Sequence, residues 1–196
     1  MSLIPAFEMG VWNAWILMLY PALHPLIIWL VLGKEGWKRL GNLDGMSFTK
    51  AQQRIGNVST AILALLSIYS IFLPLKLGTI WFYLGLPVYL IGFITFTIAI
   101  VNVATTPLDE PFTRGMYRYS RHPLYATYFL MFIGVGIASA SWVFLLFSIV
   151  HIIPSFFHAI WEERFCLKKY GDAYRRYMNK SPRWIGIPKS GEIDKI

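Results

Sequence analysis

The sequence predicts an all-α membrane protein, a polytopic bundle of about five transmembrane helices that forms a single domain over residues 1–196. Composition is the first observation behind this prediction: 56% of the residues are hydrophobic and only 14% are charged, where soluble domains carry about 25% charged residues. The second is that the apolar residues gather in long runs. A helix that crosses roughly 30 Å of hydrocarbon needs about 20 such residues.

Five apolar runs mark the predicted spans. They cover approximately residues 11–32, 58–75, 80–101, 124–138 and 142–160. Prolines lie inside several of these runs, and a membrane bundle tolerates the resulting kinks where neighbouring helices satisfy the freed backbone groups. Short connections join the second run to the third and the fourth to the fifth, so each pair is predicted to form a helical hairpin. We divide the domain into three N-terminal spans (1–102) and a core (103–196) that contains the second hairpin and a C-terminal amphipathic helix.

The basic residues are unevenly distributed between these runs. Every Lys and Arg except Lys76 lies after the first run, before the fourth run or in the C-terminal segment. With five spans these three segments share one face of the membrane, and the positive-inside rule makes that face cytoplasmic and places the N-terminus outside. The net charge of +8 does not suggest nucleic acid, because the basic residues do not interleave with a polar surface. The lone cysteine, Cys166, excludes an intramolecular disulfide and a Cys-based zinc site.

The sequence RGMYRYSRHPLYATY stands immediately before the fourth run and brings basic and aromatic residues to its mouth. Pro123 suits the first position of a helix, because its missing N–H is not needed there. His122 is then predicted at the N-cap, and a helix N-terminus flanked by Arg121 can bind an anion. An alternative stays open, in which the arginines reach lipid phosphates and the tyrosines form an interfacial aromatic belt.

The end of the fifth run supplies carboxylates to the same membrane face. It reads HAIWEERFCLKKYGDAYRRYMNK, and Glu162 and Glu163 lie at the membrane boundary. A carboxylate there requires a cation or a donor-rich ligand. A salt bridge from Glu163 to Arg118 or Arg121 is an open alternative to a ligand. Glu163 also heads an apolar and aromatic stripe at helical spacing, and the sequence does not decide whether Gly171 breaks that helix. The other members of the stripe are Leu167, Tyr170, Tyr174 and Tyr177.

An anion site, two carboxylates and several aromatic rings together favour a zwitterionic ligand that has an additional positive centre and a flat ring. S-adenosylmethionine has this combination of a carboxylate, an ammonium, a sulfonium and an adenine. The residues permit this ligand but do not by themselves single it out.

The two motifs also carry a family resemblance. RHPLYATYF is followed, after a predicted hairpin, by EERFCLKKYGDAYRRYMNKSPRW. This order resembles the integral-membrane methyltransferases of the isoprenylcysteine carboxyl methyltransferase and phospholipid N-methyltransferase superfamily. The resemblance extends over about Thr113 to Ile187, and it implies an S-adenosylmethionine-dependent methyltransferase with a lipidic or membrane-partitioned acceptor.

Carried over to this chain, the resemblance implies a set of cofactor-binding residues. They are Tyr117, Arg121, His122, Tyr125, Glu162, Glu163, Tyr174 and Arg183. His122 and Tyr125 would help to enclose the cofactor, and the two glutamates would hold its polar groups. The region of Tyr174 and Arg183 would close over the cofactor from the cytoplasm.

His158 is the candidate catalytic residue. In the carboxyl methyltransferases an arginine that faces the substrate carboxylate is expected just over one helical turn before the double glutamate, and here that place holds His158. This difference argues against an isoprenylcysteine carboxylate as the acceptor. A histidine titrates near neutral pH and can act as a base or hydrogen-bond partner for an amine, thiol or hydroxyl acceptor. A structural histidine bonded to a helix carbonyl is the open alternative.

The expected chemistry is direct displacement at the sulfonium methyl, for which the protein supplies alignment, desolvation and charge placement. A lipidic acceptor would enter sideways from the bilayer, and the water-soluble cofactor would enter from the cytoplasm.

Two other functions are compatible with a protein of this kind. Membrane sterol reductases share a similar C-terminal pattern and bind NADPH there, but they tend to have a more basic run where this chain has Glu162 and Glu163. A transporter would show internal repeats or polar residues deep in several spans, and such residues are sparse in this sequence.

Overall fold

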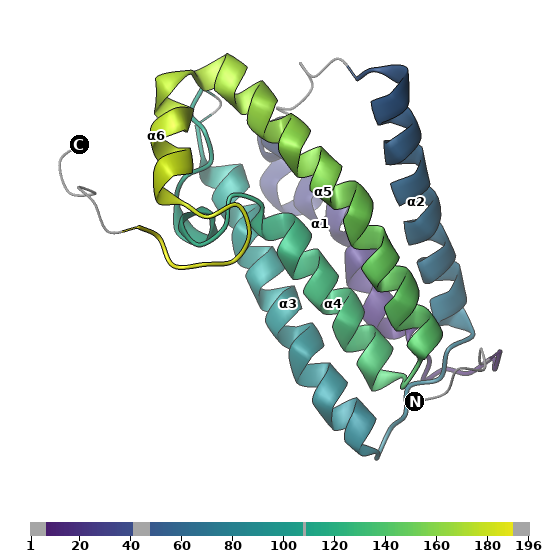
Figure 1. The fold of residues 1–196 in the computed structure, drawn as a ribbon. Helices are drawn as coiled ribbons and strands as arrows, with labels where there is room; N and C mark the ends of the chain where they lie inside the picture. The colour runs from purple at the N-terminus through teal and green to yellow at the C-terminus, as the bar shows by residue number, and fades with distance from the viewer. Residues whose placement is uncertain (1–6, 41–47, 108, 190–196) are drawn as a thin grey trace.

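The computed structural model describes residues 7–40, 48–107 and 109–189, and within these ranges every regular element is a helix, apart from one isolated β-bridge between Asn13 and Pro74. Figure 1 shows a bundle of long helices with one short helix and a C-terminal segment packed at one end. The elements are α1 (Trp15–Leu40), α2 (Lys50–Ile71), α3 (Ile80–Thr105), the 3-10 helix η1 (Gly115–Arg118), α4 (Pro123–Ala138), α5 (Trp142–Tyr170) and α6 (Asp172–Lys180). The prediction of an all-α protein is therefore confirmed.

Three of the long helices in the described part of the chain, α2, α3 and α5, are long and apolar enough to cross a membrane. The other two apolar segments are shorter. Helix α4 has 16 residues and is about 24 Å long at about 1.5 Å per residue. In α1 the apolar helical stretch within the described side chains is Trp15–His24, and the helix is kinked at Gly33, where φ is 62°. The number of five spans and the orientation of the termini stay predictions.

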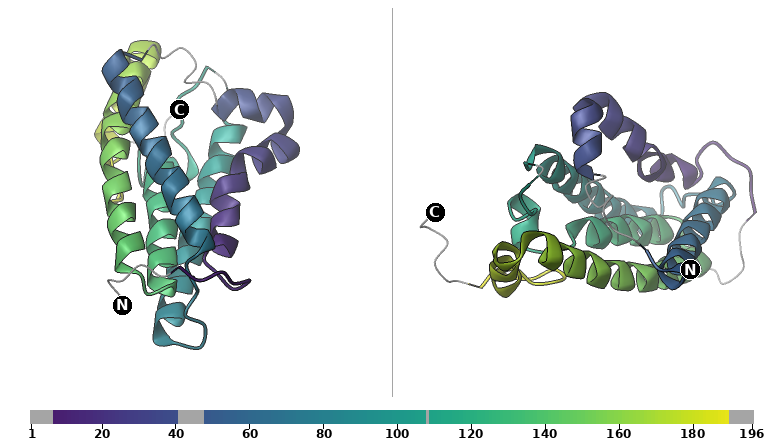
Figure 2. Two further views of the ribbon diagram at one scale, coloured as in Figure 1. Left: turned by 90° about the vertical axis from the view of Figure 1, so that its right-hand side faces the viewer. Right: turned by 90° about the horizontal axis from the view of Figure 1, so that it is seen from above.

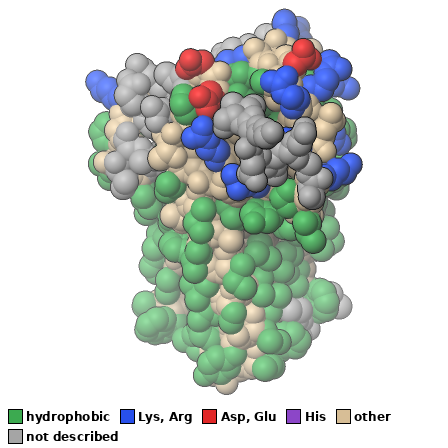
Figure 3. All heavy atoms as spheres, turned by 90° about the vertical axis from the view of Figure 1, so that its left-hand side faces the viewer, with side chains coloured by type: hydrophobic (Ala, Val, Ile, Leu, Met, Phe, Trp, Pro, Cys, Tyr) green, Lys and Arg blue, Asp and Glu red, His purple; other side chains and the backbone are tan. Residues whose placement is uncertain are grey.

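The surface of the bundle is apolar and its interior contains hydroxyl groups, as expected for a protein surrounded by lipid. Leu65 of α2, Ile91 of α3 and Leu146 of α5 are more than half exposed. Thr127 and Ser148 are buried, and each donates a hydrogen bond to the carbonyl one helical turn earlier, at 2.8 and 2.7 Å. Figure 3 shows that charged side chains gather at one end of the molecule, with apolar side chains over the rest of that face.

Helices α3 and α4 pack against each other most closely, and glycine makes this approach possible. A Cβ atom at Gly134 of α4 would lie 2.4 Å from the backbone nitrogen of Tyr89 on α3, and one at Gly92 would lie 2.8 Å from the backbone nitrogen of Met131. Figure 2 shows α5 on the other side of α4, α2 beside α5, and α1 against α3. Helix α4 is therefore the central helix, and its N-terminal end is fixed in position by both neighbours.

Helix α5 continues without interruption past the predicted span end at residue 160 and stops at Tyr170. Gly171 has φ of 55°, a conformation that favours glycine, and α6 starts in a new direction immediately after it. The predicted stripe is therefore divided between two helices. Tyr174 and Tyr177 of α6 are nevertheless buried, in a cluster with Val103 and Tyr117.

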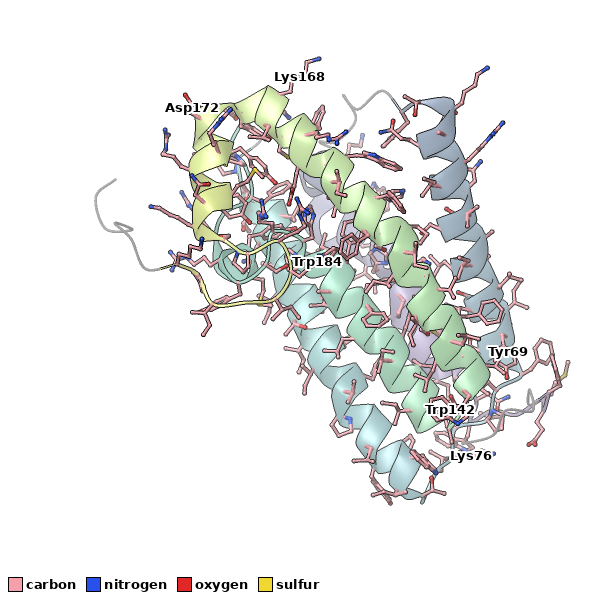
Figure 4. All side chains as sticks on the ribbon, viewed as in Figure 1. Tyr69, Lys76, Trp142, Lys168, Asp172 and Trp184 are labelled. Carbon is pink, nitrogen blue, oxygen red and sulfur yellow. The ribbon has the colours of Figure 1, made fainter. Side chains whose placement is uncertain are left out.

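After α6 the chain returns across the N-terminal end of α4 as an extended segment, which we call the C-terminal strap (residues 181–187; yellow in Figure 1). The backbone N–H of Arg121 donates to the carbonyl of Pro182 at 2.9 Å, and the N–H of Gly186 donates to the carbonyl of Tyr119 at 3.0 Å. Figure 4 shows Trp184 of the strap beside the helices, and Lys76 at the end of the bundle opposite to Lys168. The fold thus brings the two sequence motifs and the strap to one end.

Candidate active site

His122 lies at the centre of the site. It is the N-cap of α4 and Pro123 is the first helical residue, which confirms the predicted start of this helix. The imidazole is buried and lies between two carboxylates that project from α5. Its Nδ1 is 3.2 Å from Oε2 of Glu162, and its Nε2 is 3.2 Å from Oε1 of Glu163.

The two carboxylates control the protonation of His122. Burial acts to lower the pKa of the imidazole, but its hydrogen bonds to Glu162 and Glu163 and their negative charges outweigh burial, so the pKa is raised above the usual 6.5. A protonated ring can donate from both nitrogens at once, one to each carboxylate. His122 therefore favours the imidazolium form, which links the start of α4 to α5.

Glu163 is buried and surrounded by positive charge. Arg183 of the strap donates from Nε to Oε1 at 3.0 Å and from Nη2 to Oε2 at 2.7 Å, a two-point contact. Nη1 of Arg121 lies 3.3 Å from Oε1 of Glu163. The open alternative of a salt bridge to Arg121 is thus present in the structure, whereas Arg118 is exposed.

Glu162 is more accessible than Glu163. Its side chain is 21% exposed, compared with 4% for Glu163. The hydroxyl of Tyr125, on the first turn of α4, donates to Oε1 of Glu162. Of the two adjacent carboxylates, Glu162 is therefore the one that a ligand can reach.

A cavity of about 160 Å³ opens beside these groups, which we call the polar cavity. Six of the predicted cofactor residues line it: Tyr117, Arg121, His122, Tyr125, Glu162 and Tyr174. Glu163 and Arg183 are not among the lining residues and lie behind His122, where they pair with each other. The eight predicted residues thus belong to one network, in which six face the cavity and two support it.

Two tyrosines that line the polar cavity stay neutral at physiological pH. Burial raises the pKa of the Tyr117 phenol, and burial together with neighbouring groups raises the pKa of the Tyr174 phenol. The hydroxyl of Tyr177 donates to the backbone carbonyl of Tyr117 at 2.7 Å and connects α6 to η1. The lining of the polar cavity therefore offers flat aromatic surfaces and neutral hydroxyls.

Arg121 has unused hydrogen-bonding capacity that suits an anionic ligand. Its Nε and Nη1 atoms are buried, and neither makes a hydrogen bond within the described part of the chain, although Nη1 is close enough to Glu163 for an ion pair. Unpaired buried donors are costly unless a ligand or water accepts from them. A carboxylate at Arg121, an ammonium at Glu162 and a ring against the tyrosines would satisfy this cavity, and S-adenosylmethionine carries all three groups.

A second and larger cavity, of about 410 Å³, lies between the long helices; we call it the membrane cavity. His158 lines this cavity and is absent from the lining of the polar cavity. Leu124 and Tyr125 line both cavities and so form the wall between them. The predicted catalytic residue His158 therefore lies in a different cavity from the predicted cofactor residues, apart from Tyr125, which lines both.

Two contributors, Trp184 and Leu124, lie inside the quoted motifs but were not among the predicted site residues. The ring of Trp184 in the strap lies 4.8 Å from the ring of Phe156 and 6.0 Å from that of His122, measured between ring centroids. The signal for Trp184 in the sequence is its position directly after Arg183. Nothing in the chemistry of Leu124 marks it in the sequence as a site residue, because only the packing of the helices places it in the wall between the two cavities.

Comparison with protein families places this arrangement in a known group. A model of the phospholipid methyltransferase family matches residues 73–173, which extend from the start of the α2–α3 connection through α3, α4 and α5 to the beginning of α6. No curated protein and no solved structure matches the chain. The match covers just over half of the 196 residues, contains His122, Tyr125 and both glutamates, and does not support the reductase alternative. The chain belongs to the phospholipid methyltransferase family.

Proposed function

We propose that this protein transfers a methyl group from S-adenosylmethionine to a lipidic acceptor, with the methyl donor in the polar cavity and the acceptor in the membrane cavity. The observation that carries the proposal is the wall formed by Leu124 and Tyr125, which is shared by the two cavities. Because the two cavities share these lining residues they are adjacent, and two substrates of opposite solubility can approach each other there, each arriving from its own medium.

The residues of the polar cavity support the assignment of the donor. Arg121 would take the carboxylate of S-adenosylmethionine through Nε and Nη1, which make no hydrogen bond within the described part of the chain, and Glu162 would take the ammonium. The rings of Tyr117 and Tyr174 would flank the adenine. Glu163 and Arg183 would fix the positions of His122 and of the strap without contacting the ligand.

The membrane cavity supports the assignment of the acceptor. It is lined mainly by apolar side chains of α2, α3, α4 and α5. Of these helices, α2, α3 and α5 are long and apolar enough to span a bilayer. An acyl or prenyl chain therefore meets apolar surface there. Bound S-adenosylmethionine supplies an electrophilic methyl group, and the chain itself supplies alignment and exclusion of water.

We also propose that the site faces the cytoplasm. The basic residues that follow the first run, precede the fourth and form the C-terminal segment lie on the predicted inside, and Lys76 lies at the opposite end of the bundle (Figure 4). In this orientation the polar cavity would open toward the aqueous compartment from which the water-soluble methyl donor arrives.

Equilibrium binding to the detergent-purified protein tests the proposal against the reductase alternative. We expect S-adenosylhomocysteine to bind with a dissociation constant in the micromolar range, and NADPH not to bind at the same concentrations. The variant Glu162→Gln should weaken binding of S-adenosylhomocysteine about tenfold or more, because it removes the charge that faces the ammonium. Binding of NADPH without binding of S-adenosylhomocysteine would overturn the methyltransferase assignment.

A further inference from the structure

Another cavity, of about 380 Å³, is lined by the C-terminal end of α6, by the C-terminal strap and by Arg121, and we call it the strap cavity. Three of its lining residues are basic: Arg121, Lys180 and Lys189. None of the described residues that line it is Asp or Glu, and Asn179 and Ser181 add uncharged polar groups. The lining therefore combines positive charge with hydrogen-bond donors, which suits an anion.

Arg121 is the buried member of this basic set. Its side chain is 10% exposed, and its Nε and Nη1 atoms make no hydrogen bond within the described part of the chain. Arg121 lines the polar cavity as well as the strap cavity, so it lies between the two. A guanidinium carries five N–H donors, which are enough to serve an acceptor in each cavity.

The backbone at the end of α6 is arranged so that it does not oppose an anion. The C-terminal end of a helix carries partial negative charge on carbonyls that lack a partner. Here the carbonyl of Tyr177 accepts from the N–H of Ser181, and the carbonyl of Lys180 accepts from the N–H of Lys189, both at 2.9 Å. The second bond also joins the end of the strap to α6, and it brings Lys189 next to Lys180.

Apolar side chains stand beside these cations on the strap. Ile187, which lines the strap cavity, is 90% exposed, and Ile185 is 77% exposed. The ring of Trp184 packs on Phe156, a 46% exposed residue of α5, with the ring centroids 4.8 Å apart. Helix α5 is long and apolar enough to cross a membrane. Exposed apolar residues next to basic ones are typical of a membrane interface, where acyl chains meet charged headgroups.

We propose that the strap cavity binds a phosphate group that carries net negative charge, with Lys180, Lys189 and Arg121 as its donors. Acidic phospholipids and small soluble phosphate esters both carry this group, and the exposed isoleucines favour the lipid. The strap cavity shares no lining residue with the membrane cavity, so its ligand is a different molecule from the methyl acceptor. A bound phosphate would connect α6, the strap and the start of α4.

A zwitterionic headgroup fits this cavity less well than an acidic one. The phosphate of phosphatidylcholine is accompanied by a quaternary ammonium, which would meet three cations and, among the described lining residues, no carboxylate. The headgroup of phosphatidic acid brings only the phosphate. The two lipids therefore distinguish recognition of a net negative charge from contact with acyl chains alone.

Binding of short-chain probes to the detergent-purified full chain tests this site without reference to methyl transfer. Dihexanoyl phosphatidic acid, dihexanoyl phosphatidylcholine and glycerol 3-phosphate are each titrated by calorimetry in a neutral detergent at low salt. We expect saturable binding of phosphatidic acid and binding of phosphatidylcholine that is about tenfold weaker or more. Glycerol 3-phosphate should bind more weakly than phosphatidic acid; equal affinity would support the phosphate site and assign its ligand to the aqueous phase. Absence of phosphatidic acid binding, or equal affinity for the two lipids, overturns the proposal.

Substitutions locate the bound probe on the protein. Replacing both Lys180→Gln and Lys189→Gln removes two charges, keeps the backbone hydrogen bond between these residues, and should weaken binding of phosphatidic acid about tenfold or more. The matched control is Arg175→Gln with Arg176→Gln, which removes two charges from exposed positions of the same helix that do not line the cavity. Exposed charges of this kind contribute little, so the control should change affinity less than about twofold.

Two further variants separate loss of charge from loss of folding. Replacing both Lys180→Arg and Lys189→Arg keeps the charge and should retain affinity within about threefold. Lys189→Gln alone, at an exposed residue, should weaken binding about threefold. Unchanged affinity when both lysines are replaced by glutamine, or an equal loss in the arginine control, would show that phosphatidic acid responds only to the general basic surface, and would overturn the proposal.

Discussion

Arg183 and Glu163 join the C-terminal strap to helix α5 through two parallel hydrogen bonds, of 3.0 and 2.7 Å, across 20 residues of sequence. The same carboxylate contacts His122, at the start of α4. A single buried side chain therefore holds three separate segments around the polar cavity. Because Glu163 does not line that cavity, its contribution to ligand binding comes through the groups that it positions.

Substitution of Glu163 tests this positioning. We expect Glu163→Ala to weaken binding of S-adenosylhomocysteine about tenfold or more, because Arg121 and His122, which line the polar cavity, lose the carboxylate that holds them in position. Isothermal titration of the purified variants measures the change. The control is Glu110→Ala, which removes an exposed carboxylate that lies 3.7 Å from Arg114 and should change affinity less than threefold. Equal effects of the two substitutions would show that Glu163 does not organise the site.

The raised pKa of His122 predicts a pH-dependent contribution to stability. Because the folded protein holds the proton more tightly than the unfolded chain, the contribution is fully present below pH 6.5 and is lost as the pH rises through the raised pKa. We expect wild type and His122→Gln to differ most in apparent melting temperature near pH 5 and progressively less toward pH 9. A difference that is constant or grows with pH would mean that the folded state does not favour the imidazolium.

The sequence was sufficient to predict the helical class, the start of α4 at Pro123 and the grouping of two motifs at one end, because these follow from hydrophobic runs, helix-start chemistry and connection lengths. It could not predict which of two adjacent glutamates faces the cavity. That depends on the rotation of α5 about its own axis, which is set by packing against α4 and the strap. The wall at Leu124 and the position of Trp184 depend in the same way on contacts between distant segments.

The break at Gly171 shows a related limit. Helical periodicity alone allows the stripe from Glu163 to Tyr177 to continue as one straight helix. The structure bends it at Gly171, and Tyr174 packs back against the core. The sequence allows either form, and burial of the tyrosines against Tyr117 selects the bent one.

The proposed orientation is testable with two cysteines in a Cys166→Ala background. Lys76 and Asp172 lie at opposite ends of the bundle (Figure 4), so Lys76→Cys should react with a membrane-impermeant maleimide in intact cells, and Asp172→Cys only after permeabilisation. Labelling of both positions in intact cells would contradict an orientation with the N-terminus outside and the C-terminus in the cytoplasm.

Replacement of His158 by arginine separates acceptor choice from cofactor binding. An arginine stays protonated, so it pairs with a carboxylate but cannot accept a proton. We expect His158→Arg to lower transfer to the native acceptor at least tenfold and to change S-adenosylhomocysteine affinity less than about threefold, equivalent to under ~0.7 kcal/mol. Both quantities are measured on the same preparations. Equal losses of transfer and binding would place His158 at the cofactor and not at the acceptor.

The proposed function requires that a methyl group passes from the polar cavity to a lipid in the membrane cavity. The most direct test is to incubate the purified protein with methyl-tritiated S-adenosylmethionine and vesicles of total membrane lipid, and to measure tritium in the organic extract together with S-adenosylhomocysteine in the aqueous phase. We expect the two products to form in equal amounts with the wild type and Glu162→Gln to lower both about tenfold or more. S-adenosylhomocysteine formed without labelled lipid, or labelled lipid formed equally by heat-inactivated protein, would contradict it.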